Sequence, residues 1–319
     1  MSSAHLPEFV QALGHGIHAI DTAFQRDHFD AAYLMVHGGR AAFIDTGTNN
    51  AVPRLLTALQ ALGLSHDDVD WVIPTHVHLD HAGGAGLLMQ QLPRARLLVH
   101  PRGARHMIDP GPLRASATAV YGAEEMNRSY GEVLPVPAER VHMSTDGMTV
   151  RLADRTLLLA DTPGHARHHH CIWDGTSRGW FTGDTFGLSY REFDTARGAW
   201  IVPTSTPIHF DPEALRQSIK RLLLHQPACM YLTHFGRVQD VPRLGKLLLS
   251  LLDEMAALGR RLQHAHQRHK ALKSGQLEIF ARSLRSHGFE GSLAQIEALL
   301  AMDLELNAQG LAIWLDRSA

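Results

Sequence analysis

The chain contains few cysteines and has little net charge. Only two cysteines, Cys171 and Cys229, occur among the 319 residues. Both lie in core-like sequence, so we expect them to be small buried side chains of a protein in a reducing compartment. The formal net charge is −2. Such a balance provides no general attraction to nucleic acid or to an anionic membrane, and nucleic acid is therefore not expected as a partner.

Long apolar runs are absent as well. No stretch approaches the roughly 18 apolar residues that a membrane-spanning helix needs. Residues 1–8 combine neither the basic nor the apolar region of a secretory signal. The sequence therefore predicts a cytoplasmic protein without a membrane partner. Hydrophobic residues at 45% and charged residues at 19% are ordinary for a globular chain with a sizeable core.

Histidine, in contrast, is concentrated in one short segment. Residues 76–81 read His-Val-His-Leu-Asp-His and carry four potential metal ligands. An apolar run over 70–75 predicts a buried strand before them, and small residues over 82–88 predict a helix after them. Side chains two residues apart in extended backbone point the same way, so His76 and His78 can converge on one ion. The turn that follows can direct Asp80 and His81 to a neighbouring ion.

Three further segments place single ligand-competent residues after strand-like runs. They are Asp161-Thr162-Pro163-Gly164-His165, Phe181-Thr182-Gly183-Asp184-Thr185 and Met230-Tyr231-Leu232-Thr233-His234-Phe235-Gly236. With these four motifs in this order, the chain resembles the metallo-β-lactamase-fold hydrolases over roughly residues 15–240. The resemblance implies an α/β protein with a four-layer αββα sandwich. It also implies a catalytic domain over 1–240 and a helical extension over 241–319, as in glyoxalase-II-like members.

The resemblance also implies a dinuclear metal site. His76, His78 and His165 would hold the first ion, Asp80, His81 and His234 the second, and Asp184 would bridge them. Asp45 and His169 would support these ligands without binding metal. Imidazole and carboxylate ligands suit zinc best, with iron or manganese as alternatives. The neighbours of His169, namely His168 and His170, are expected to be polar residues at a strand edge.

Two cations sharing one water would lower its pKa and produce a metal-bridging hydroxide that attacks a carbonyl. Asp80 would orient this nucleophile and carry a proton to the leaving group. A thioester of the glyoxalase-II type is the leading substrate, and an acyl-homoserine lactone is the alternative. Gly187 stands where lactonase relatives have a tyrosine. The aspartate bridge disfavours β-lactam hydrolysis. A regulatory metal-binding protein with incidental hydrolysis also stays open.

Several elements around the motifs can be predicted. Phe186, Tyr190 and Arg191 follow the bridging aspartate and are candidates for substrate binding, with ordinary loop packing or a surface ion pair as the alternative. An insertion over 101–145 would shape a substrate pocket or serve as a packing appendage. A helix over 242–262 is followed by helical segments over 277–285 and 292–301, the last with a capping box at Ser292. These helices would cap the metal site or form a homodimer interface. His264, His266 and His269 are expected on a polar helix.

Overall fold

The computed structural model describes residues 6–206 and 208–318. The chain divides into two compact units. Unit 1 contains the residues up to 161 together with 168–183 and 231–237, and unit 2 contains 162–167, 184–230 and the residues from 238 onward. This division differs from a boundary at residue 240, because four segments between 162 and 237 alternate between the units. The separation into a catalytic domain and a helical extension stays a prediction.

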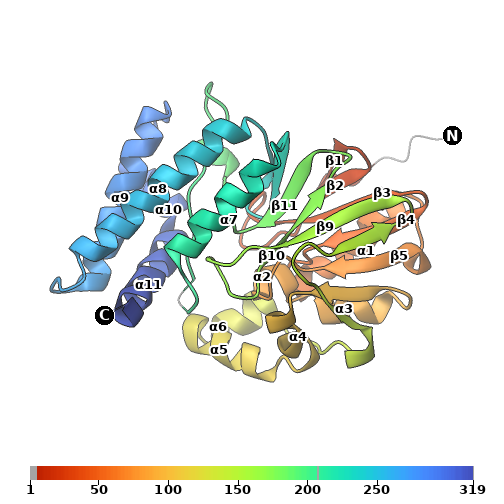
Figure 1. Ribbon diagram of the computed structural model, residues 1–319. Helices are drawn as coiled ribbons and strands as arrows, with labels where there is room; N and C mark the ends of the chain where they lie inside the picture. The colour runs from red at the N-terminus through yellow and green to blue at the C-terminus, as the bar shows by residue number, and fades with distance from the viewer. Residues whose placement is uncertain (1–5, 207, 319) are drawn as a thin grey trace. The chain divides into compact units, whose positions relative to one another are not determined.

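Unit 1 is built on a seven-stranded sheet whose strands follow the order of the chain (Figure 1). The first four strands are antiparallel, and the last three run parallel to β4. Parallel neighbours need crossover connections, which the chain supplies through helices between them. The strands are β1 (Val10–Gly14), β2 (Ile17–Asp21), β3 (Ala31–His37), β4 (Arg40–Ile44), β5 (Val69–Ile73), β6 (Arg96–Val99) and β7 (Val141–Met143).

A second, six-stranded sheet has the order β13-β12-β11-β10-β9-β8. Its strands are β8 (Thr149–Leu152), β9 (Arg155–Asp161), β10 (His170–Asp174), β11 (Gly179–Gly183), β12 (Cys229–Leu232) and β13 (Gly236–Val238). Tyr33 of β3 joins the two sheets: its ring lies 5.2 Å from that of Phe181 and 5.7 Å from that of Tyr231, and its hydroxyl donates to the Leu232 carbonyl. The sheets therefore pack on each other around aromatic side chains.

Helices complete unit 1. The core joins α1 to the first sheet through Leu55 and Leu59, which are fully buried with Leu34 and Phe43. The helices of this unit are α1 (Val52–Ala61), α2 (Leu79–Ala82), α3 (Ala85–Gln91), α4 (Pro101–Ile108), α5 (Gly111–Tyr121) and α6 (Ala123–Glu125), with a π-helical turn η3 (Met126–Tyr130) after α6. The predicted insertion thus consists of helices up to residue 130.

Unit 2 is mainly helical. Its helices are α7 (Pro212–Leu224), α8 (Val241–Arg261), α9 (Arg268–Ser286), α10 (Leu293–Leu299) and α11 (Ala301–Ser318). α8 and α9 lie side by side (Figure 1). The capping box predicted at Ser292 is confirmed. The Ser292 hydroxyl accepts from the Gln295 backbone amide, and the Gln295 side-chain oxygen accepts from the Ser292 backbone amide. Within residues 6–206 and 208–318, none of the helices has the length and apolar character that crossing a membrane would require.

The strand predicted over 70–75 and the helix predicted over 242–262 are confirmed to within about two residues by β5 and α8. The other predicted helices differ more at their ends: α3 begins at Ala85 rather than 82, α9 begins at Arg268 rather than 277, and α10 ends at Leu299 rather than 301. The polar helix expected under His264 and His266 is wrong: both lie between α8 and α9, where Gln267 adopts a left-handed conformation with φ +53° that interrupts helical backbone. Cys171 and Cys229 are buried free thiols, as expected.

Candidate metal centre

The loop after β5 carries the densest group of candidate ligands. β5 ends at Ile73, and His76 and His78 lie in the loop that follows, where the backbone of His78 is extended. The Nε2 atom of His76 lies 2.7 Å from Nδ1 of His78. Helix α2 then begins at Leu79 and turns the next side chains, Asp80 and His81, to a different direction. The change from extended to helical backbone thus separates two pairs of ligand-competent side chains within six residues.

Asp80, His81 and His234 form a compact group within unit 1. One ligand atom from each lies within 4.8 Å of the other two. Asp80 Oδ2 is 3.4 Å from His234 Nε2 and 3.6 Å from His81 Nε2. The Asp80 side chain is 24% exposed, whereas His81 is fully buried. Asp80 is therefore the member of this group that solvent and small molecules can reach most easily.

A buried carboxylate fixes the position of His81. Asp45 Oδ2 lies 2.9 Å from His81 Nδ1. Asp45 also accepts hydrogen bonds from the Thr75 amide and hydroxyl and from the Thr233 hydroxyl. An acceptor at Nδ1 favours the tautomer in which Nε2 carries the lone pair, so His81 presents Nε2 toward Asp80. Thr75 and Thr233 each directly precede a candidate ligand, and the repeated Thr-His pair is the sequence signal that could have revealed both.

His234 is oriented in the same manner. Its Nδ1 lies 3.1 Å from the Phe29 carbonyl oxygen, which leaves Nε2 facing Asp80. The next residue, Asp30, is fully buried, and its carboxylate accepts from the Thr22 hydroxyl at 3.0 Å. Burial raises the pKa of Asp30 to about 7, against the opposing effect of the nearby His234 and His81. No motif in the sequence marks Phe29 or Asp30.

Two further candidate ligands meet within unit 2. His165 Nε2 lies 3.3 Å from Asp184 Oδ2. Its Nδ1 lies 3.5 Å from the Thr204 carbonyl, and its own carbonyl accepts from the Thr206 hydroxyl at 3.0 Å. Gly164 precedes it with φ +131°, and a Cβ atom there would lie 2.2 Å from the Leu215 amide nitrogen. Glycine in this turn therefore permits the close packing that holds His165.

The donor atoms match the requirements of a divalent cation. In His81, His165 and His234, Nδ1 faces an oxygen acceptor and Nε2 faces a carboxylate. Metal-binding histidines characteristically bond the second ring nitrogen to a carboxylate or a carbonyl oxygen. Imidazole nitrogen and carboxylate oxygen are ligands for zinc, iron and manganese. The residues present therefore fit bound divalent metal.

The three consecutive histidines after His165 have separate environments. The ring of His169 stacks on His76 with centroids 4.7 Å apart, and His168 Nδ1 accepts from the Val77 amide at 3.4 Å. His170 bonds to the Pro74 carbonyl and the Ser144 hydroxyl, and burial lowers its pKa to about 4. The expectation of strand-edge residues at 168 and 170 is wrong, because both side chains are buried and β10 is an interior strand between β9 and β11.

The residues after Asp184 are packed within unit 2. Phe186 is fully buried, and the Tyr190 hydroxyl donates to Asp303 Oδ1 at 3.1 Å. Arg191 donates to the Ser189 carbonyl and pairs with Asp194 at 3.3 Å. These partners belong to the chain itself, and contact of the three residues with a substrate stays a prediction.

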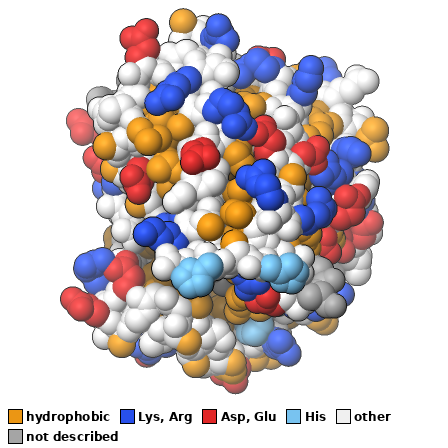
Figure 2. Space-filling model, turned by 90° about the vertical axis from the view of Figure 1, so that its left-hand side faces the viewer, with side chains coloured by type: hydrophobic (Ala, Val, Ile, Leu, Met, Phe, Trp, Pro, Cys, Tyr) orange, Lys and Arg blue, Asp and Glu red, His pale blue; other side chains and the backbone are white. Residues whose placement is uncertain are grey.

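On the face of the molecule shown in Figure 2, acidic and basic side chains are interspersed with hydrophobic ones. This distribution agrees with the near-neutral net charge of the sequence.

Comparisons with known proteins agree with these motifs. The sequence profile of the metallo-beta-lactamase superfamily matches residues 27–234. A beta-lactamase-like protein 2 homolog of Caenorhabditis elegans is 26% identical over 152 residues, which is 48% of this chain and only 42% of that protein. A metallo-beta-lactamase fold-containing protein of Sulfurisphaera tokodaii is 24% identical over 234 residues, or 70% of this chain and 79% of the relative.

Solved structures extend the likeness to the fold. The metallo-beta-lactamase family protein of Thermus thermophilus has a TM-score of 0.68 at 20% identity. The superposition covers 96% of this chain and 95% of the Thermus thermophilus chain. The solved structure of the same archaeal protein, ST1585 from Sulfolobus tokodaii, has a TM-score of 0.60 at 23% identity. It covers 86% of this chain and 99% of the archaeal chain. The chain thus has the metallo-β-lactamase α/β sandwich with a C-terminal helical region, and it belongs to the metallo-β-lactamase superfamily of metal-dependent hydrolases.

Proposed function

We propose that the protein is a dinuclear metal-dependent hydrolase that attacks the carbonyl group of a thioester. His76, His78 and His165 would hold the first ion, Asp80, His81 and His234 the second, and Asp184 would bridge them. Zinc is the preferred metal, with iron or manganese as alternatives. The observation that carries the proposal is the common orientation of His81, His165 and His234, each with Nδ1 toward an oxygen and Nε2 toward a carboxylate.

Bound divalent ions would supply Lewis acidity and a water molecule of lowered pKa. The protein's own contribution centres on Asp80. Its carboxylate is partly exposed and lies within 3.6 Å of two imidazole groups, so it can accept a hydrogen bond from an attacking water and hold its direction. The Asp80 carboxylate can then carry the proton of this water to the departing thiolate. Asp45 keeps His81 in one tautomer throughout, because its carboxylate is held by Thr75 and Thr233.

Gly187 favours a thioester over a lactone. A Cβ atom at this position would lie 2.4 Å from the Val202 carbonyl oxygen and 2.8 Å from Leu248 Cδ1, and the backbone has φ +73°. No larger side chain, and hence no tyrosine, is compatible with this backbone. The hydroxyl that the lactonase-like members have at this position is therefore missing, and the nearby Tyr190 already bonds to Asp303.

We further propose a small-molecule carbonyl substrate, a cytoplasmic location and no nucleic-acid partner. The residues from 241 onward would form the helical extension, as a cap over the metal centre or as a homodimer interface. A regulatory role with incidental hydrolysis is the alternative. It would be favoured if Asp184→Ala abolished hydrolysis while the cellular phenotype of the intact gene persisted.

The direct test is hydrolysis of matched substrates by metal-loaded protein. We would measure kcat/KM on S-lactoylglutathione, a simple acyl thioester and an acyl-homoserine lactone, with Asp80→Asn beside the wild type. The proposal expects a metal-dependent value above about 10⁴ M⁻¹s⁻¹ on a thioester and a loss of about 100-fold or more in the variant. A high value on the lactone alone would establish the alternative substrate. Feeble rates on all three would contradict thioester hydrolysis.

A further inference from the structure

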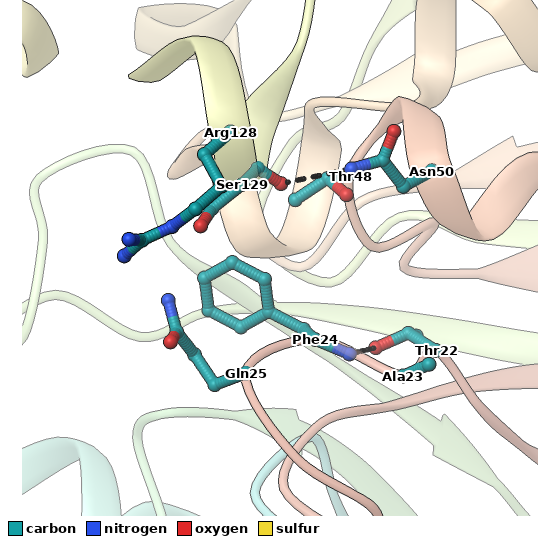
Figure 3. A pocket seen from close by; sticks show the side chains of 8 residues that line it. All are labelled: Thr22, Ala23, Phe24, Gln25, Thr48, Asn50, Arg128 and Ser129. Atoms are coloured by element: carbon teal, nitrogen blue, oxygen red, sulfur yellow. Dashed lines mark hydrogen bonds between the residues drawn. The ribbon is translucent and has the colours of Figure 1, made fainter. Parts of the chain in front are cut away.

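A cavity of about 340 Å³ opens within unit 1 (Figure 3). Its walls come from three segments that are far apart in the sequence. They are the loop between β2 and β3, the turn before α1, and the π-helical turn η3 of the insertion. The lining residues are Thr22, Ala23, Phe24, Gln25, Thr48, Asn50, Arg128 and Ser129. The volume lies within the usual range of small-molecule pockets.

Two of these walls belong to loops that contact candidate metal ligands. The ring of Phe24 lies 5.9 Å from that of Phe29, whose carbonyl oxygen is the acceptor facing His234 Nδ1. Thr48 follows Thr46, whose amide and hydroxyl both donate to the His81 carbonyl. A ligand in this cavity would therefore rest against the same loops that position His81 and His234.

The cavity lining is polar and carries a single charged group. Arg128 is the only ionisable side chain among the eight, and hydroxyl and amide groups supply most of the remaining polar atoms. Asn50 Nδ2 donates to the Ser129 carbonyl at 3.4 Å, which ties two walls together (Figure 3). Phe24 adds one apolar surface and packs against Tyr130 with ring centroids 5.3 Å apart. These groups suit an anionic, hydrogen-bonding ligand with a short apolar part.

Glu125 holds three of the lining side chains in place. Its carboxylate accepts from Gln25 at 3.1 Å and Ser129 at 2.5 Å, and it pairs with the Arg128 guanidinium. These hydrogen bonds lower the pKa of Glu125, so it stays ionised near neutral pH. A guanidinium has five N–H donors. Arg128 therefore retains donors for a ligand while Glu125 restricts its rotamers.

We propose that this cavity binds the carboxylate-bearing thiol portion of the thioester substrate, with Arg128 as the residue that selects the negative charge. This inference rests on the proposed function for the identity of the substrate. With the leaving group held against the loops that contact His81 and His234, the acyl end of the substrate would extend toward Asp80. Cleavage transfers the acyl carbon from sulfur to the oxygen of water, and the proton released from water passes to the thiolate. The products are an acid and a free thiol.

The binding step can be tested without hydrolysis. The probes are S-methylglutathione, a thioether with two carboxylates, and its diethyl ester, in which both are masked. Isothermal titration would compare wild type, Arg128→Gln and the control Arg114→Gln. Arg114 is exposed on α5 of the same insertion and does not line the cavity. Because the Arg128 side chain is 68% exposed, we expect its loss to weaken the binding of S-methylglutathione by about two- to fivefold, as for an exposed ion pair.

The ester should bind wild type and Arg128→Gln equally, and Arg114→Gln should behave as wild type. Equal weakening of both probes by Arg128→Gln, or no weakening of either, would overturn the assignment of charge selection to Arg128. Failure of both probes to bind wild type would overturn the cavity as the thiol site. Hydrolysis of an uncharged acyl thioester, measured separately, reports on the proposed function alone. The two proposals can therefore fail independently.

Discussion

The two compact units hold their candidate ligands in different ways. In unit 1 one buried carboxylate, Asp45, contacts His81 and bonds to the threonines that precede His76 and His234. In unit 2 the oxygen atoms next to His165 are a backbone carbonyl at Thr204 and a hydroxyl at Thr206. An ionised anchor increases the basicity of its histidine, whereas a carbonyl oxygen mainly fixes the ring orientation.

The support of His165 extends into the C-terminal helix. Asn307 of α11 is fully buried. Its Oδ1 accepts from the Ser205 amide at 2.6 Å, and its Nδ2 donates to the Pro203 carbonyl at 3.3 Å. Asn307 thus fixes the segment whose two threonines contact His165. The comparison teaches that the ligand group of unit 1 is anchored by charge, whereas His165 depends on a segment fixed by residues more than 100 positions away.

Removing the charge of Asp45, which anchors the ligand group of unit 1, should have the largest effect on metal binding. In Asp45→Asn the charge that stabilises the His81 N–H is lost while the size of the side chain is kept. We expect zinc affinity to fall about 10- to 100-fold, the usual effect of losing a carboxylate behind a metal-binding histidine. Competition with a chromophoric chelator would measure this. Asp154→Asn, which alters an exposed carboxylate, is the matched control, and an Asp45→Asn affinity within twofold of wild type would contradict the charged-anchor account.

Acid should weaken unit 1 through His170. Its pKa is about 4 in the folded protein against 6.5 when exposed, so the unfolded chain takes up a proton first as the pH falls. The free energy of unfolding therefore has its full value above about pH 6.5, and it decreases progressively as the pH falls toward 4. At pH 5 the loss amounts to about 2 kcal/mol.

Urea unfolding of metal-free protein at pH 7.5 and pH 5 would measure the contribution of His170 to the free energy of unfolding. His170→Gln removes the titrating ring, so its unfolding free energy should change less between the two pH values than that of wild type. His266→Gln, at an exposed position, should keep the wild-type pH dependence. Identical pH dependences for wild type and His170→Gln would show that His170 does not contribute.

Removing the Asn307 side chain, which fixes the segment next to His165 in unit 2, should have the smallest effect on metal binding. Asn307→Ala leaves the buried Ser205 amide without its acceptor, which should lower the free energy of unfolding by about 1 to 2 kcal/mol. The Thr204 carbonyl would still be present, so we expect zinc affinity to fall by less than about tenfold. Chelator competition and urea unfolding would be run beside Asn127→Ala at an exposed position. A loss of affinity larger than that of Asp45→Asn would reverse the comparison.

The motifs predict much of this architecture because local backbone geometry determines it. The strand before residue 76, the turn of direction at Leu79 and the tight turn at Gly164 each follow from a few consecutive residues. The family resemblance then predicted the sandwich. The resemblance also predicted the supporting role of Asp45, which directly follows β4 and precedes a Thr-Gly pair.

The support of the ligands could not be predicted in the same way. Phe29, Asp30 and Thr204 have no distinctive spacing, and their roles depend on chain segments that meet only in the folded protein. Asn307 lies in a helix whose sequence indicates only amphipathic packing. The alternation of chain segments between the units has the same cause, because contacts distant in the sequence determine it.

The most direct test of the central claim is the number of metal ions that the chain holds. Zinc-loaded wild type, Asp184→Ala and Asp154→Asn would be dialysed and analysed for metal by mass spectrometry, with thioester hydrolysis measured on the same samples. The dinuclear account predicts about two equivalents in wild type and in Asp154→Asn. It predicts about one or fewer in Asp184→Ala, with hydrolysis reduced at least about 100-fold. Wild type that hydrolyses thioesters with less than one equivalent, or Asp184→Ala that keeps both ions and full activity, would contradict it.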